Sequence, residues 1–253
     1  MSRVLSRGKR RAVRRRVHLV HWLRVCMIAF LLPMGFAVGV VIFLGGAGLL
    51  GPELAAAEVY SSRQVISNGD AAWSLVLVNK ENAVPSDYAL TLSQLQNGIY
   101  VDERIVEPLE ELFHAARTDG VYPAVQVGYR TGQQQKRVQE SIVDSFRSRG
   151  YSTADAIAAA ARQEGASGHG EHQLGIAVDI GGDGVNSTDA QVHRWLRDNG
   201  WQYGFVLRYP MEKTDITGMD YAPEHYRYVG QEAAAAMAEQ GVCLEEYLLG
   251  QPR

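Results

Sequence analysis

The most uniform pattern in the chain is an uncharged apolar segment near its start. No charged residue occurs between Val25 and Pro52, and this segment contains the run VCMIAFLLPMGFAVGVVIFLGGAGLL. Because about 20 apolar residues span the core of a bilayer, residues 25–52 are predicted to form one transmembrane helix. Pro33 is tolerated in such a helix, where neighbouring groups satisfy the freed carbonyl. A cleaved signal peptide is the alternative, although its apolar region would usually span only about 7 to 15 residues.

After residue 70 the apolar positions follow two periods, which predict helices and strands. Helical spacing and capping residues predict helices from Asp102 to about Thr118, from Gln133 to Arg149, from Thr153 to Gln163, from Ser187 or Thr188 to Gly200, and through EAAAAMAEQG to Gly241. Alternation and short apolar runs predict strands at WSLVLVN (Trp73–Asn79, or an extended lead-in), Ala124–Arg130, IAVDI, Trp201–Leu207 and HYRYVG (His225–Gly230). These elements lack a regular βαβ order, so the predicted fold class is α+β, with a mostly antiparallel sheet flanked by helices.

Charge divides the chain more sharply than its formal net charge of -3 suggests. Nine of the 25 basic residues lie in the first 24 positions, and no acidic residue precedes Glu53. The 201 residues after position 52 hold 16 basic and 28 acidic side chains, a net charge of -12. We therefore divide the chain into a basic cytoplasmic arm (1–24), the transmembrane helix (25–52), a stalk or linker (53–70) and one outer domain (71–253).

The basic arm also predicts the orientation of the chain. Lys and Arg flanking a span are retained on the cytoplasmic side, so we expect a single-pass protein of the cell membrane with its outer domain extracytoplasmic. The arm has no aromatic interleaving and no folded basic module, so its expected partner is membrane lipid and not nucleic acid. Cys26 lies in the predicted span and Cys243 in the outer domain, which excludes a disulfide within that domain. We expect a monomer.

The candidate chemistry of the outer domain centres on a segment rich in Gly and His, GHGEHQLGIAVD. His172 stands seven residues before Asp179, and a turn at Gly175 followed by a short strand could bring the two side chains together. Both residue types bind zinc, and a catalytic zinc site has three protein ligands and one open position. His225, at the start of the last strand, is the candidate third ligand. The spacing by itself is equally compatible with a Gly-rich turn and a capping Asp.

Several segments of the outer domain resemble a known family. GHGEHQLGIAVDI is similar to the SxHxxGxAxD motif, and LRYPMEKTDITGMDYAPEHYRYVG resembles the C-terminal signature, of the VanY-like D-alanyl-D-alanine carboxypeptidases in the LAS group of zinc peptidases. LVNKENAVPSDY and GYRTGQQQ match two further segments. The resemblance runs from about Leu75 to Leu249 in the family's order, which is nearly the whole outer domain.

The resemblance implies one zinc ion held by His172, Asp179 and His225. It also implies that Arg130 faces the carbonyl or carboxylate of the substrate. A guanidinium suits that role, because a peptide ending in D-Ala-D-Ala is an anion. Gln135 matches a family glutamine behind this arginine, and we give it a supporting role in substrate binding. The implied substrate is a peptidoglycan stem peptide or its precursor.

Two positions depart from the family pattern. The family's general-base Glu stands three residues before the last zinc-binding His, where this chain has Ala222, and a Glu instead stands next to that His, as Glu224. Adjacent residues of a strand point to opposite faces, so Glu224 reaches the site only if the backbone bends at Ala222-Pro223. Gly170 replaces the first Ser of the family motif and removes a hydroxyl near the substrate.

Three hypotheses for the general base follow. In the first, a turn at Ala222-Pro223 lets Glu224 act as the base. In the second, Asp220 or Glu171 acts. In the third, the domain keeps its metal and has lost most catalysis, a loss of about 10²- to 10⁴-fold that is easily measured.

The predicted function is a membrane-anchored zinc D,D-carboxypeptidase that removes the terminal D-alanine from stem peptides, with Glu224 and Arg130 as catalytic residues. The first alternative, favoured by Ala222, is a catalytically weakened, zinc-containing domain that binds muropeptide. The second is a D,D-dipeptidase or endopeptidase of the same family, because the depth of the cleft is set by loops.

Overall fold

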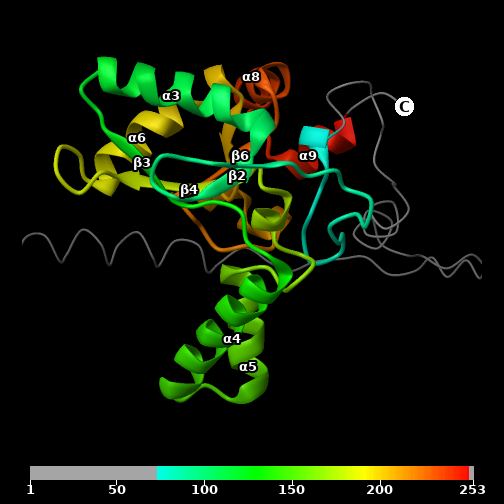
Figure 1. Ribbon diagram of the computed structural model, residues 1–253. Coiled ribbons are helices and arrows are strands. Elements are labelled where there is room, and N and C mark those ends of the chain that lie inside the picture. Colours follow the sequence, from blue (N-terminus) through cyan, green and yellow to red (C-terminus); the bar gives the residue numbers. More distant parts are fainter. Residues whose placement is uncertain (1–72, 251–253) are drawn as a thin grey trace, which may run out of the picture. The chain divides into compact units, whose positions relative to one another are not determined.

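A four-stranded antiparallel sheet forms the centre of the domain (Figure 1). The computed structural model describes residues 73–250, and the strands of this sheet lie in the order β3 (Pro123–Val127), β4 (Ala177–Gly182), β6 (His225–Tyr228) and β5 (Phe205–Leu207). Each neighbouring pair in the sheet is antiparallel. A second antiparallel pair joins β1 (Leu92–Gln94) to β2 (Tyr100–Asp102). Together with the helices, these antiparallel sheets confirm the predicted α+β class.

The predicted basic arm, transmembrane helix and stalk lie outside the described residues. Among the helices of residues 73–250, none combines the length and the apolar character that a membrane crossing requires.

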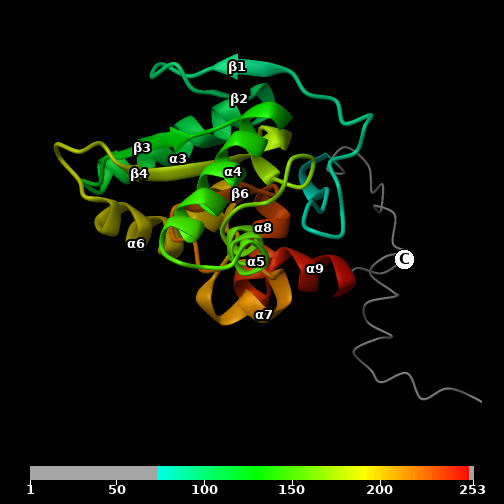
Figure 2. The same ribbon diagram turned by 90° about the horizontal axis from the view of Figure 1, so that it is seen from below.

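The helices lie on two sides of the sheet (Figures 1 and 2). Helix α3 (Val106–Thr118) runs along one side, and the hairpin of α4 (Gly132–Ser148) and α5 (Thr153–Gln163) projects from the other. The other α-helices of residues 73–250 are α6 (Asp189–Asn199), α7 (Thr214–Thr217), α8 (Gln231–Gln240) and α9 (Leu244–Gly250).

Side-chain caps explain where several helices begin. Thr131 precedes α4 and forms a capping box with Gln134, and Thr188 forms the same arrangement with Gln191 before α6. Ser152 caps α5 by accepting a hydrogen bond from a backbone N–H of the first turn. The predicted boundaries of these three helices therefore agree with the structure to within one or two residues.

Alternation along β4 and β6 gives the sheet a core face and a polar face. Val178 and Ile180 of β4 and Tyr226 of β6 pack into the main hydrophobic core beneath α3 and α6. Their neighbours along the strands, Asp179 and His225, point to the opposite face because successive strand residues alternate. The apolar residues of each strand thus fix which polar residues face the functional site.

The predicted strand Ala124–Arg130 is wrong in its last three residues, because β3 ends at Val127. Gly128 passes so close to β2 that a Cβ added there would lie 2.3 Å from the Tyr100 carbonyl oxygen. The amide of Arg130 then donates to the His172 carbonyl at 3.1 Å instead of joining the sheet. This departure carries Arg130 to the segment that holds His172.

Two other predicted strands also differ from the structure. In Trp201–Leu207, the first residues form the 3-10 turn Gly200–Tyr203, and the strand begins only after Gly204, whose φ is 84°. The segment Trp73–Asn79 begins with a 3-10 turn at residues 73–75 and continues without strand pairing, so it is the extended lead-in. The β1–β2 pair, α7 and α9 are not among the elements predicted from the sequence.

Candidate metal centre and active site

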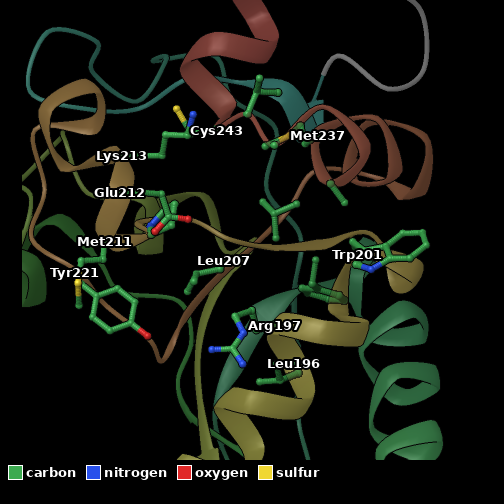
Figure 3. A pocket seen from close by; sticks show the side chains of 16 residues that line it. Leu196, Arg197, Trp201, Leu207, Met211, Glu212, Lys213, Tyr221, Met237 and Cys243 are labelled. Atoms are coloured by element: carbon green, nitrogen blue, oxygen red, sulfur yellow. The ribbon is translucent and has the colours of Figure 1, made fainter.

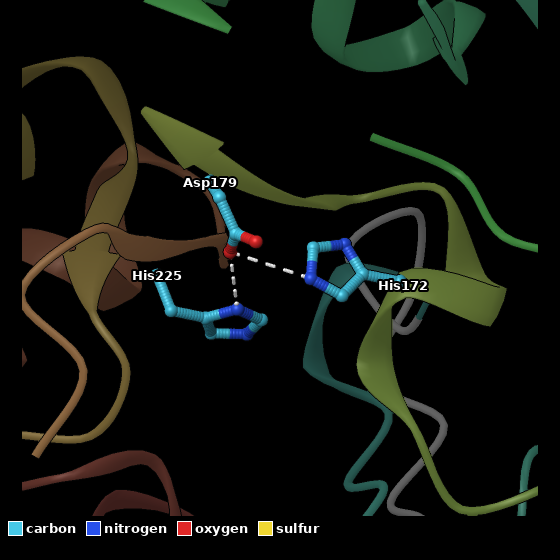
Figure 4. Close-up of side chains that lie close together, drawn as sticks. All are labelled: His172, Asp179 and His225. Carbon is cyan, nitrogen blue, oxygen red and sulfur yellow. Dashed lines mark hydrogen bonds and ion pairs between the residues drawn. The ribbon is translucent and has the colours of Figure 1, made fainter. Parts of the chain in front are cut away.

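Three side chains from separate elements converge on the polar face of the sheet (Figure 4). The Asp179 Oδ1 atom lies 2.9 Å from His225 Nδ1 and 3.3 Å from His172 Nε2. The potential ligand atoms of the three residues all lie within 4.8 Å of one another. The structure therefore brings together the three residues that the sequence analysis selected as metal ligands.

Sheet register and a glycine turn place these residues. Asp179 and His225 are directly opposite each other in the β4–β6 ladder. His172 lies in the 3-10 helix Glu171–Leu174, which ends at Gly175 with a φ of 70°. A side chain at this glycine would meet the backbone nitrogen of Asp102 at 3.0 Å, so both conformation and space require glycine. The chain turns here and enters β4, as the sequence predicts.

This donor set suits a zinc ion. It offers two imidazole nitrogens and one carboxylate oxygen, and both histidines are buried. Zinc in catalytic sites is held by three such protein ligands with a further position open to water or substrate. The His225 Nε2 atom faces the Glu171 Oε2 atom at 3.5 Å, a pairing that leaves Nδ1 free to bind a metal. Within the described residues, His172 Nδ1 is buried without a hydrogen-bond partner, so Nε2 is the nitrogen directed at the site.

The neighbours of Asp179 and Glu171 keep both carboxylates of the site ionised. Burial raises the pKa of Asp179, but hydrogen bonds from His172 and His225 outweigh burial and hold that pKa well below its usual range. Burial also raises the pKa of Glu171, but the charges of Arg208 and Arg227 lower it by more, so that this pKa lies well below its usual range. Burial lowers the pKa of His225, whereas hydrogen bonds with Asp179 and Glu171 raise it to about 9. Both carboxylates are consequently ionised at neutral pH.

Arg130 lies beside this centre. Its Nη2 atom is 3.9 Å from Asp179 Oδ2, and its Nη1 atom is 2.8 Å from Glu164 Oε2. Gln135 is fully buried and donates from Nε2 to Glu164 Oε1 at 2.8 Å and to the Gly165 carbonyl at 2.6 Å. Gln135 thus fixes the Glu164 carboxylate, and this carboxylate in turn pairs with Arg130. Gln135 therefore lies behind the arginine.

Glu224 reaches the site through a turn. The amide of His225 donates to the Ala222 carbonyl at 3.2 Å, and β6 begins only at His225. Glu224 precedes the strand, so its side chain need not point to the face opposite His225. It lines the same cavity as all three candidate ligands. Within residues 73–250, its carboxylate has no hydrogen-bond or ion-pair partner. This is the bend that the first hypothesis for the general base required.

The other two acids considered as bases occupy different surroundings. Asp220 pairs with Arg162 on α5, with 2.7 Å between Oδ1 and Nη2, and does not line the cavity of the metal ligands. Glu171 contacts the Nε2 edge of His225 and is held by two buried arginines. Glu171 also lines the cavity, but its two oxygens contact the arginines and His225, so it supports a ligand.

The cavity at this centre has a volume of about 320 Å³. Besides the ligands and Glu224, its lining includes residues from the middle of α4, from the end of α5, from the loop before Glu171 and from the segment between β5 and β6, among them Gln139, Gln163, Glu164, His169, Tyr209 and Met219. The cavity is large enough for a short peptide end.

Gly170 has a structural explanation in its neighbour Gln135. A Cβ at position 170 would lie 2.6 Å from Gln135 Nε2 and 2.7 Å from its Cδ. The glutamine end is fixed by two hydrogen bonds and cannot give way without losing them. The amide group of Gln135 thus occupies the space next to position 170, where the family motif carries a serine.

Sequence reasoning missed two residues of the site. Glu164 ends α5 and pairs with Arg130 across 34 positions of the sequence. Tyr209 stacks on the His225 ring with 5.0 Å between centroids, and burial raises the pKa of its hydroxyl so that it remains a hydrogen-bond donor. Tyr209 lies within the quoted segment LRYPMEK, so its position in a matched motif was an available signal. Nothing local marks Glu164.

A larger cavity, of about 580 Å³, lies apart from the metal ligands (Figure 3). Its walls include Leu196 and Trp201 on one side and Met211 and Tyr221 on another, and none of the candidate ligands lines it. Volume alone would select this cavity, but the convergent ligands and ionised carboxylates mark the smaller one as the functional site.

The fold and site together define an α+β domain of the metal-dependent hydrolase type, with a His-Asp-His centre on an antiparallel sheet. Comparison with known families then identifies it. The sequence model of the family described as VanY, D-alanyl-D-alanine carboxypeptidase, matches residues 98–231, more than half of the chain. The chain therefore belongs to the VanY family, as its motifs indicated.

Individual relatives agree with this assignment. The chain is 50% identical over 176 residues to a D-alanyl-D-alanine carboxypeptidase of Enterococcus faecalis, a match that covers 70% of this chain and 66% of that relative. The solved structure of VanYB in complex with D-alanine-D-alanine is 49% identical, with a TM-score of 0.70, covering 71% of this chain and 99% of that one. A mutant of the vancomycin resistance D,D-pentapeptidase VanY, from a VanB-type resistance cassette and in complex with Zn(II), is 50% identical, with a TM-score of 0.68, covering 70% and 99%.

Proposed function

We propose that this protein is a zinc-dependent D,D-carboxypeptidase that removes the terminal D-alanine from peptidoglycan stem peptides or their precursors. The observation that carries the proposal is the convergence of His172, Asp179 and His225 at a cavity that Glu224 also lines. Relatives about half identical to this chain, one solved with D-alanine-D-alanine and one with Zn(II), support the substrate and the metal.

The side chains of the site divide the work of hydrolysis. Zinc held by the three ligands would supply a Lewis acid that activates water and polarises the scissile carbonyl. Glu224 takes the proton from the attacking water and passes it to the leaving amine of D-alanine. Arg130, beside Asp179, stabilises negative charge on the substrate carbonyl or binds its terminal carboxylate. Water is consumed, the peptide bond breaks, and the products are the shortened peptide and D-alanine.

The test uses the purified full chain loaded with Zn(II) and a peptide ending in D-Ala-D-Ala. We expect release of D-alanine, and we expect His172→Ala to lose both zinc binding and release. His114→Ala is the matched control, because this histidine is exposed on α3 and away from the site. A wild-type protein that binds zinc and releases no D-alanine would refute the proposed hydrolase activity.

One observation favours the second function, a zinc-containing domain that binds muropeptide without efficient catalysis. Ala222 occupies the position of the family's general base and contributes only a methyl group to the cavity wall. Such a domain would bind the peptide with slow or no release of D-alanine.

Comparing the free dipeptide, an acylated D-Ala-D-Ala peptide and a cross-linked peptide as substrates separates dipeptidase, carboxypeptidase and endopeptidase activity.

We also propose that the N-terminal apolar segment anchors the domain on the outer side of the cell membrane, beside its polymeric substrate. The proposal rests on the uncharged run of residues 25–52 and the nine basic residues before it. The full chain should be found in the membrane fraction of untreated cells. Protease added to intact, wall-stripped cells should digest its outer domain. Protection of the domain from the protease would contradict this orientation.

A further inference from the structure

Four buried charged side chains lie behind the metal centre and belong to none of its ligands. Glu171, Arg208, Arg227 and Glu245 are all at most 3% exposed. Arg208 donates from Nε to Glu171 Oε1 at 2.8 Å, and Arg227 donates from Nη1 to the same oxygen at 2.9 Å. The other Glu171 oxygen, Oε2, faces His225 Nε2 at 3.5 Å. Glu171 thus joins two arginines to a candidate zinc ligand.

The chain of contacts continues to the C-terminal helix. The two terminal nitrogens of Arg208 donate to both carboxylate oxygens of Glu245 on α9, at 2.7 and 2.6 Å. Arg227 is fixed separately by the carbonyls of Ser74 and Val76, at 3.0 and 2.9 Å. Two arginines and two glutamates balance in charge, so the network as a whole is neutral.

A network of this kind calls for a reason beyond folding. Taking charged groups out of water is costly, and replacing buried ion pairs by apolar residues of similar volume is often neutral or stabilising. In contrast, groups that hold metal-binding histidines commonly change metal affinity by about 10- to 100-fold when they are mutated. Glu171 contacts Nε2 of His225, whereas Nδ1 of the same ring faces Asp179 and the metal site. Glu171 is therefore a group that holds a metal-binding histidine.

We propose that α9 is a functional part of the metal centre, because Glu245 positions His225 through Arg208 and Glu171. Glu245 fixes the guanidinium of Arg208, and that guanidinium fixes the carboxylate of Glu171. This carboxylate accepts the Nε2–H of His225 and so sets the orientation and the tautomer of the imidazole ring. Glu245, Arg208 and Glu171 are therefore positioning residues. The inference rests on the metal centre of the proposed function and not on hydrolysis.

The test compares zinc affinity of full-length variants that differ at adjacent positions of α9. Glu245→Gln removes one charge from the network, whereas Glu246→Gln removes one charge from a partly exposed pair with Lys213, 2.8 Å away. Competition with a chromophoric chelator should show zinc binding weakened about 10- to 100-fold by Glu245→Gln and changed by no more than about twofold by Glu246→Gln. The visible spectrum of the Co(II)-loaded protein should shift only for Glu245→Gln.

A second variant guards against simple loss of the fold. Arg208→Lys keeps the buried charge but cannot donate to Glu171 and to both Glu245 oxygens at once. We expect this variant to remain folded without metal and to bind zinc at least about tenfold more weakly. Equal zinc affinity in all variants, equal losses for Glu245→Gln and Glu246→Gln, or unfolding of both network variants would overturn the positioning role. A wild-type chain without zinc affinity would remove the metal centre itself, whereas zinc binding without D-alanine release would refute only the hydrolase function.

Discussion

Asp179 and His225 lie directly opposite each other on β4 and β6, and their side chains meet at 2.9 Å between Oδ1 and Nδ1. Forty-six positions separate them in the sequence. Two residues in register on adjacent antiparallel strands are held by the whole ladder between them, so their geometry does not depend on loop conformation. The register of β4 and β6 therefore fixes two of the three proposed zinc ligands relative to each other.

Removal of a ligand from this strand pair should abolish metal binding. We expect Asp179→Asn to lower zinc affinity by orders of magnitude, because a neutral amide replaces an ionised ligand whose pKa lies well below its usual range. The fold should remain, since Asp179 lies on the polar face of β4 and the core residues are unchanged. Equilibrium dialysis with Zn(II) measures the first effect, and circular dichroism the second. Stoichiometric zinc in Asp179→Asn would refute the ligand assignment.

The general base is tested at positions 222 and 224. Glu224→Gln should lower kcat by about 10²- to 10⁴-fold with zinc affinity retained, because it removes a proton acceptor and no ligand. Ala222→Glu in the same background should restore part of the rate, since position 222 also faces the cavity. Asp220→Asn is the control, because Asp220 pairs with Arg162 outside the cavity. A rate lost in Asp220→Asn and kept in Glu224→Gln would reverse the assignment.

The close approach of Gln135 to Gly170 predicts a specific pair of variants. Gly170→Ser should destabilise the domain by about 1–3 kcal/mol, because its Cβ displaces a buried side chain and breaks that side chain's hydrogen bonds. Because Glu164 and Arg130 lose their support, kcat/KM should fall as well. Gly170→Ser with Gln135→Ala should recover only the part of the loss that comes from the clash, because Gln135→Ala lacks the same two hydrogen bonds, and it should leave kcat/KM low. An unchanged melting temperature in the single variant would show that position 170 tolerates a side chain.

The reactivity of Cys243 gives a prediction about pH. Burial raises the pKa of its thiol to about 12, and the side chain is only 4% exposed. Since only the thiolate reacts, alkylation should be about 10³-fold slower than for a free cysteine near pH 8 and should accelerate as the pH rises toward 12. A Cys26→Ser variant of the full chain isolates this signal in an iodoacetamide time course followed by mass spectrometry. Denaturant should abolish the protection, and rapid labelling of the native chain would contradict the burial of the thiol.

Local signals in the sequence determined much of the domain. Capping residues such as Thr131, Ser152 and Thr188 act within a few positions, and the helices they begin were predicted to within one or two residues. The motif around His172 and Asp179, the glycine turn between them and the last histidine identified the candidate ligand set that the structure brings together. The same signals were less reliable where glycines interrupt an apolar pattern, as at Gly128 and Gly204, because the chain there leaves or joins the sheet.

Only the tertiary structure decided how those residues cooperate. The turn that brings Glu224 to the cavity, the pairing of Glu164 with Arg130, and the buried contacts from Glu245 through Arg208 to Glu171 all join residues from separate elements. Periodicity and capping record interactions within a few residues of the chain, whereas these contacts depend on strand register and on the packing of helices far apart in sequence. The sequence by itself thus determined which residues could bind the metal, and the fold decided which buried residues contact them and which carboxylate near the cavity has no partner among the described residues.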